Sequence, residues 1–172
     1  MHGGMLMPRP EPKLPQLPPN CGPGRELTLD LEQFVPYRLS VLTNRVSNAI
    51  AREYSARFGL TIAEWRVMAV LGGTSGLSAR EVAARTEMDK VQVSRAVANL
   101  MRDKRVQRLT DDADARVSRL SLSAKGRAIY DEIVPLALHF EAQFLAALSP
   151  EECAVFDRLL AKLARKAKLL RG

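Results

Sequence analysis

Apolar residues recur every three or four positions along most of this chain, which is the pattern of amphipathic helices. The spacing predicts six helices, over residues 30–58, 62–71, 79–86, 90–102, 124–148 and 150–170. Pro36 falls in the first two turns of the first helix, and Pro135 interrupts the fifth. The chain is therefore expected to be mainly α.

Capping residues mark where several of these helices begin. The T/S-x-x-E pattern of a capping box occurs three times, at Thr61 with Glu64, Ser78 with Glu81, and Ser149 with Glu152. In such a box the hydroxyl and the carboxylate each satisfy a backbone N–H that the helix leaves free. Gly59, Gly72, Gly73 and Gly76 are placed to end the first two helices.

One segment alternates between apolar and polar residues, as a half-exposed hairpin does. Residues 106–109 form its first half, 110–115 its loop, and Leu120 and Leu122 alternate with polar residues in its second half. Two short helices followed at once by this basic hairpin predict a winged helix-turn-helix. The expected fold class is mainly α with a small β-hairpin, in which the winged domain is flanked by dimerisation helices.

The helix over residues 90–102 carries the chemistry of a recognition helix. One face is apolar, with Val93, Val97, Leu100 and Met101. The other presents groups that hydrogen-bond to base edges or phosphates in the major groove. The residues we expect to contact DNA are Ser78, Lys90, Gln92, Ser94, Arg95, Asn99, Arg102, Arg105 and, at the hairpin tip beside Asp112 and Asp114, Arg116.

Charge and composition agree with a nucleic-acid partner. The chain carries a net charge of +7, and residues 78–127 hold 12 basic against 7 acidic side chains. Residues 1–24 contain seven of the ten prolines, which predicts a flexible arm. No stretch is long and apolar enough to span a bilayer and no leader opens the chain, so a soluble, cytoplasmic protein is expected.

The order of these motifs resembles the MarR family of bacterial regulators. The resemblance rests on LSAREVAARTEMDKVQVSRAVANLMRDKRVQR from Leu77, the D-x-R tip at Asp114 and Arg116, and the L-x-L-S-x-x-G exit at Leu120 to Gly126. It covers residues 30–170. Arg105 departs from the family, which commonly has glycine there, and an arginine is expected to add a phosphate contact.

The resemblance implies a domain organisation and a dimer. Residues 25–172 form a MarR-like domain, in which 77–123 bind double-stranded DNA at a pseudo-palindromic operator. Residues 25–76 and 124–172 supply dimerisation and support. The expected homodimer interface uses Leu31, Phe34, Phe156, Leu160, Leu163 and Leu170.

The resemblance also implies a repressor that a small aromatic carboxylate, such as a hydroxynicotinate, releases from DNA. Arg38 is the candidate anchor, because a guanidinium pairs with a carboxylate through two hydrogen bonds. Trp65, Arg66 and His139 are the other candidates for the ligand site. Three of the four also have a structural interpretation: Trp65 as core, His139 as an interface residue and Arg38 as a surface ion-pair member.

Three alternatives compete with this hypothesis. A redox-sensing repressor would use Cys21 or Cys153, although Cys153 lies on an apolar helix face. A sequence-indifferent DNA-packaging protein would not need the amide and hydroxyl groups of residues 90–99. An enzyme is disfavoured, because the chain has two histidines, no Gly-rich phosphate loop and no metal-ligand set. No cofactor and no metal are expected.

Overall fold

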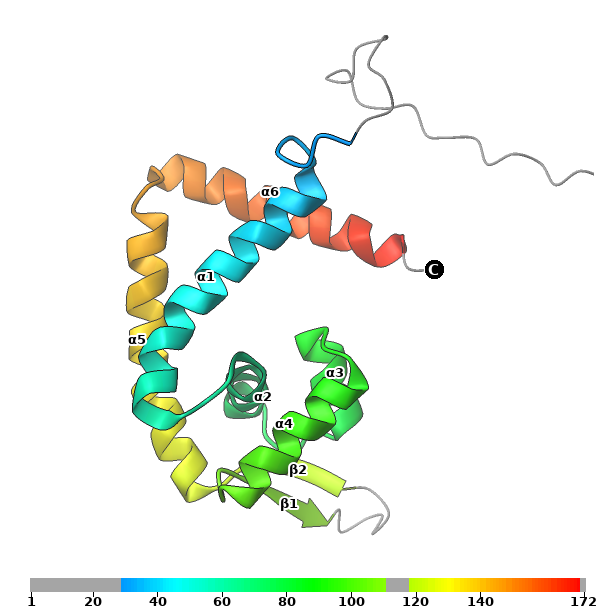
Figure 1. Cartoon of the computed structure of the whole chain (residues 1–172), viewed down its shortest axis with the longest axis vertical. Coiled ribbons are helices and arrows are strands. Elements are labelled where there is room, and N and C mark those ends of the chain that lie inside the picture. The colour runs from blue at the N-terminus through cyan, green and yellow to red at the C-terminus, as the bar shows by residue number, and fades with distance from the viewer. Residues whose placement is uncertain (1–28, 111–117, 171–172) are drawn as a thin grey trace, which may run out of the picture. The chain divides into compact units, whose positions relative to one another are not determined.

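The computed structural model describes residues 29–110 and 118–170 (Figure 1). The elements, in chain order, are α1 (Val35–Phe58), α2 (Ile62–Gly73), α3 (Ala79–Thr86), α4 (Lys90–Arg102), β1 (Val106–Thr110), β2 (Ser118–Leu122), α5 (Ala124–Leu145) and α6 (Pro150–Leu169). The predicted class, mainly α with one hairpin, is confirmed. The chain divides after Val41 into two compact units, residues 1–41 and 42–172.

The helix starts predicted from capping patterns are confirmed. Thr61, Ser78 and Ser149 are N-caps, and each closes a complete capping box with the glutamate three residues later. Ser123 caps α5 by accepting a hydrogen bond from the Gly126 N–H. These bonds join neighbours in sequence, which is why the sequence alone reveals them.

The first helix begins later than predicted, at Val35 instead of Asp30. Asp30 forms a turn: its carboxylate accepts from the Glu32 N–H and its carbonyl from the Gln33 N–H. Pro36 then lies in the first helical turn, where its missing N–H is not needed. A second boundary also differs: α5 ends at Leu145, three residues before the end predicted for the fifth helix.

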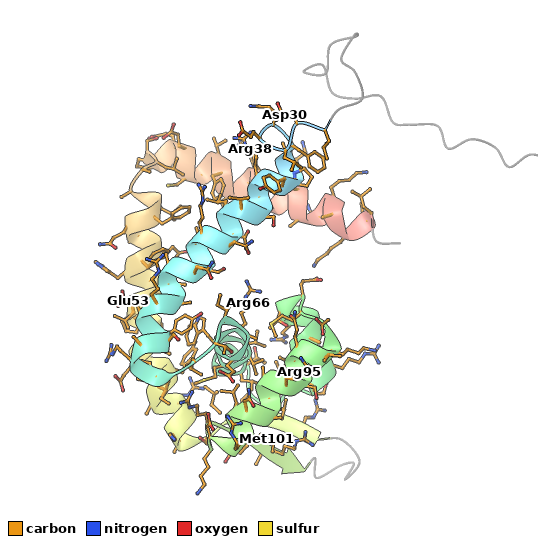
Figure 2. All side chains as sticks on the ribbon, viewed as in Figure 1. Asp30, Arg38, Glu53, Arg66, Arg95 and Met101 are labelled. Atoms are coloured by element: carbon orange, nitrogen blue, oxygen red, sulfur yellow. The ribbon has the colours of Figure 1, made fainter. Side chains whose placement is uncertain are left out.

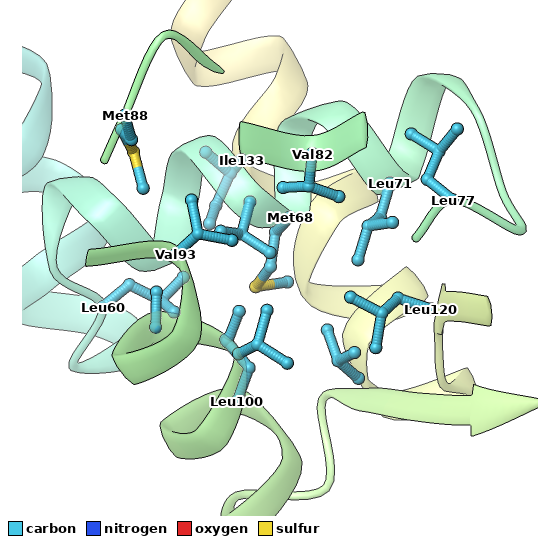
Figure 3. Close-up of a cluster of buried hydrophobic side chains, with 14 of the residues drawn as sticks. Leu60, Met68, Leu71, Leu77, Val82, Met88, Val93, Leu100, Leu120 and Ile133 are labelled. Carbon is cyan, nitrogen blue, oxygen red and sulfur yellow. The ribbon is translucent and has the colours of Figure 1, made fainter. Parts of the chain in front are cut away.

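The core of the second unit is one apolar cluster to which seven elements contribute, the helices α1 to α5 and both strands. Met68 and Leu71 of α2 lie among Val82 of α3, Val93 and Leu100 of α4, Leu120 of β2 and Ile133 of α5 (Figure 3). Burial of each such side chain contributes about 1.5–3 kcal/mol. This packing holds α3, α4 and the hairpin together.

Candidate nucleic-acid interface

Helix α4 is built to present one face outward. Asp89 caps it, with its carboxylate accepting from the Gln92 N–H at 2.8 Å. Val93, Ala96, Val97 and Leu100 are buried. The opposite face is therefore exposed to a partner over the whole length of the helix.

Four of the predicted DNA contacts lie exposed on this face, namely Lys90, Gln92, Ser94 and Arg95. Figure 2 labels Arg95 on α4. They combine two cations with an amide and a hydroxyl, which together can donate to phosphates and base acceptors and accept from base donors. The structure thus groups the polar residues that the sequence predicted for readout of the major groove.

Ser78, one of the predicted DNA contacts, is the N-cap of α3. Its hydroxyl donates to the Glu81 carboxylate at 2.7 Å and accepts from the Glu81 N–H at 3.2 Å. Hydrogen bonds from the backbone N–H and the hydroxyl of Ser78 hold the pKa of the Glu81 carboxyl below its ordinary value. Any contact of Ser78 with DNA therefore has to compete with the capping box.

Asn99 is not free on the outer face, contrary to the prediction. Its side chain is half-buried, and Nδ2 donates to the Glu64 carboxylate of α2 at 3.0 Å. Asn99 lies on the border between the two faces of α4, where a residue from another helix reaches it. Periodicity within α4 contains no information about that partner.

The expected phosphate contact of Arg105 is also not supported. Its guanidinium turns inward and donates to the Phe58 carbonyl at the end of α1 at 2.6 Å, while Nε and Nη1 are buried. That carbonyl is one of the acceptors that a helix C-terminus leaves unpaired. Lys104, with φ of 58°, adopts the left-handed conformation just after α4 ends. Arg102 remains exposed beside Asp103.

Both strands attach the hairpin to the core, since Val106 of β1 and Leu120 of β2 are buried in it. Strands β1 and β2 are antiparallel, with Val106 opposite Leu122 and Arg108 opposite Leu120. Leu120 is buried and forms an additional bridge with Leu77. The tip residues 111–117, including Arg116 and its acidic neighbours, lie outside the described residues, so the wing-tip contact stays a prediction.

Two cations beside α4 are absent from the set predicted from sequence. Arg80 of α3 and Arg108 of β1, together with Lys90, line a hollow of about 800 Å³ whose remaining lining is mostly apolar. They come from three separate elements, so no single helix pattern groups them. The available signal for Arg108 was its position two residues after Val106, which places both side chains on the same side of the strand.

Trp65, a candidate ligand residue, belongs largely to the core. Its ring lies 5.7 Å from that of Tyr54 and 6.0 Å from that of Tyr130, centroid to centroid. Burial raises the pKa of Tyr54 to about 12, and the charge of Arg66 opposes that rise. The half-buried Arg66, labelled in Figure 2, therefore acts electrostatically on this aromatic stack.

The other two candidate ligand residues, Arg38 and His139, are exposed. Arg38 lies in the first compact unit of the chain, whereas Trp65, Arg66 and His139 lie in the second. The grouping of the four side chains into one ligand site therefore stays a prediction.

The residues predicted for dimerisation are exposed in the single chain. Leu31, Phe34, Phe156, Leu160, Leu163 and Leu170 are all at least 40% accessible. Helix α6 has no buried residue along its described length. An apolar stripe of this extent in water is a hallmark of an unoccupied interaction surface.

Other site chemistry is sparse in the described part of the chain. Residues 29–110 and 118–170 contain no group of three or more His, Cys, Asp or Glu side chains that could hold a metal ion.

Cys153 is a free, half-buried thiol in an apolar hollow between α1, α5 and α6. Cys21 lies outside the described residues. No single described helix has the length and hydropathy to cross a membrane, although α5 and α6 meet that test when taken as a bent pair.

Comparison with known proteins points to one family. The sequence model of the MarR family matches residues 58–117. The HTH-type transcriptional regulator BilQ of Clostridium symbiosum is 30% identical over 95 residues, which span 55% of this chain and 66% of that protein.

Two solved structures extend the similarity over most of the fold. A MarR/EmrR family regulator from Acinetobacter sp. ADP1 is 25% identical, with a TM-score of 0.76 over 82% of this chain and 99% of that one. Bordetella bronchiseptica BpsR, whose DNA binding is regulated by 6-hydroxynicotinic acid, is 27% identical, with a TM-score of 0.67 over 76% of this chain and 98% of that one. The matching region, the shared fold and the exposed polar face of α4 make this chain similar to the MarR family of DNA-binding winged helix-turn-helix transcriptional regulators, whose members are not enzymes.

Proposed function

We propose that this chain is a homodimeric repressor that binds a pseudo-palindromic operator and is released from it by a small aromatic carboxylate. The observation that carries the proposal is the outer face of α4, where exposed Lys90, Gln92, Ser94 and Arg95 stand opposite a buried apolar face. A helix of this kind fits the major groove, and its amide and hydroxyl groups favour sequence-specific over indifferent binding.

The exposed apolar stripe of α6 supports a dimer. Phe156, Leu160 and Leu163 are 40–53% accessible, and covering them with a second copy removes apolar surface from water. A two-fold dimer presents two α4 helices, so we expect two half-sites about one helical turn, or roughly 34 Å, apart.

The aromatic carboxylate is proposed from chemistry and from similarity to BpsR. Arg38 on α1 and Arg66 on α2 are cations able to pair with a carboxylate, and Trp65 offers an aromatic face. BpsR responds to 6-hydroxynicotinic acid, which makes a hydroxylated pyridine carboxylate the first compound to test.

The proposal is tested by sequencing the genomic fragments that the purified chain retains. A shared inverted repeat is expected among them. Titrating the complex with 6-hydroxynicotinate, with benzoate as the plain aromatic acid and cyclohexanecarboxylate as the non-aromatic control, should release DNA only with an aromatic acid. Retained fragments without a common sequence would instead indicate a DNA-packaging protein.

Arg95→Ala is expected to weaken operator binding by about 1–3 kcal/mol. The variant loses a hydrogen bond to a base, and a water molecule in its place does not restore the same binding free energy. Discrimination should relax at one position of each half-site, while binding to scrambled DNA changes little. Electrophoretic or fluorescence titration on a set of single-base operator variants measures both effects. An equal loss on every sequence would assign Arg95 to a phosphate instead.

Arg116→Ala at the hairpin tip is the contrasting variant. If the tip touches phosphates, the loss should appear on operator and scrambled DNA alike. The slope of log K against log salt should fall by about one unit per lost contact, hence about two per dimer. An unchanged affinity at every salt concentration would contradict a DNA-contacting wing.

Arg38→Ala is expected to leave DNA affinity unchanged and to weaken release by the aromatic acid, at a cost of about 1.5–3 kcal/mol in ligand affinity. The guanidinium is the proposed anchor and does not lie on α4. Arg45→Ala, another exposed arginine of α1, is the matched control and should retain full ligand response. If both variants respond equally to the ligand, Arg38 is not the residue that binds the carboxylate.

A further inference from the structure

A buried carboxylate links α2 to the recognition helix. Glu64 is only 6% exposed. Its Oε2 accepts from the Thr61 N–H at 2.9 Å, as the capping box requires, and its Oε1 accepts from Asn99 Nδ2 at 3.0 Å. The corresponding carboxylates of the other two boxes, Glu81 and Glu152, are exposed. The buried box therefore carries a second bond, to a residue 35 positions away.

The bond to Asn99 is directional, whereas the core contacts between α2 and α4 are apolar. Apolar packing between Met68 and residues such as Val93 and Leu100 holds the two helices together but tolerates small rotations. A buried carboxylate that loses a hydrogen-bond partner pays the desolvation penalty of the unpaired oxygen, which exceeds the net gain from a typical hydrogen bond. That penalty opposes any rotation of α4 that would separate Asn99 from Glu64.

The geometry points to Glu64 as a positioning residue for DNA recognition, which acts by fixing the rotation of α4 about its own axis through Asn99. Arg95 lies one helical turn before Asn99, so the direction in which its side chain is presented depends on that rotation. Asn99 is then a tether and not a reader of bases. This inference rests on the proposed role of α4 in operator recognition.

Exchange of the two functional groups tests the tether. Asn99→Asp places a second carboxylate against Glu64, and the repulsion should lower the ratio of operator to scrambled affinity about tenfold. Adding Glu64→Gln should restore that ratio to within about threefold. In the double variant the new glutamine oxygen accepts from the Thr61 N–H, the glutamine amide donates to the new aspartate, and the net charge equals that of the parent.

Two control substitutions distinguish the interaction between Glu64 and Asn99 from the effect of removing one charge. Glu64→Gln alone should have little effect, because the Asn99 amide can turn over and accept. Glu152→Gln removes the same charge from the capping box of α6, where the carboxylate accepts from the Ser149 N–H. Added to Asn99→Asp, it should not restore the ratio.

The outcomes separate this inference from the function on which it rests. If the aspartate introduced by Asn99→Asp acts on DNA directly, Glu64→Gln will not rescue it and the tether is overturned. If circular dichroism shows that the Asn99→Asp variant is not folded, the Asn99→Ala variant is used instead. Loss of discrimination at several half-site positions together then supports the tether, and loss at one position overturns it. A parent protein without operator preference would reject the proposed function itself.

Discussion

Gly126→Ala is expected to lower the free energy of unfolding by about 3 kcal/mol, the upper end of the usual range for overpacked sites. A Cβ at this position would overlap the carbonyl oxygen of Arg105. That carbonyl cannot turn away cheaply, because it accepts a hydrogen bond from the Ser123 N–H at 3.0 Å. Gly126 thus allows the start of α5 to lie directly on the chain that enters the hairpin.

Urea denaturation followed by circular dichroism measures this loss. Gly73→Ala is the matched control, because no atom lies within 4 Å of the Cβ that would be added there. It should be neutral or stabilise α2 by up to about 1 kcal/mol, as alanine has the higher helix propensity. Equal stability of the two variants would show that the backbone at Arg105 can shift to accommodate the added Cβ at little cost in free energy.

Leu160→Asp combined with Leu163→Asp is expected to convert the proposed dimer to a folded monomer and to weaken operator binding by about 10²–10⁴-fold. Both side chains are about half exposed in the single chain, so their loss leaves the core intact. Two charges at the interface oppose association because burying them without a partner costs several kcal/mol. A monomer then loses the effective concentration that the second half-site supplies.

Sedimentation at micromolar concentration, paired with DNA titration, measures both effects. Arg165→Ala is the control on the same helix, since Arg165 points away from the side that Leu160 and Leu163 share. It should sediment as the parent does. A double aspartate variant that still shows twice the chain mass would place the interface elsewhere, and Leu31 and Phe34 would then be substituted in the same way.

Local patterns in the sequence were sufficient for most of the fold. The capping boxes, the apolar stripe of α4 and the alternation of the hairpin each involve residues within a few positions of one another. Their consequences depend on backbone geometry alone, so the predicted elements match the observed ones except at the start of α1 and the end of α5. The predicted start of α1 was wrong because a turn at Asp30 interrupts a continuous apolar spacing.

Local patterns along the chain are thus enough to predict the helices, the hairpin and the polar outer face of α4. Which polar side chains on that helix and just beyond it lack a partner depends on how the helices pack. Asn99 is held by Glu64, and Arg105 by the carbonyl of Phe58. The physical reason is that a side chain at the border of a buried face takes whichever partner the packing brings within about 3 Å. Those partners lie 35 and 47 residues away, beyond the reach of any periodicity within one helix.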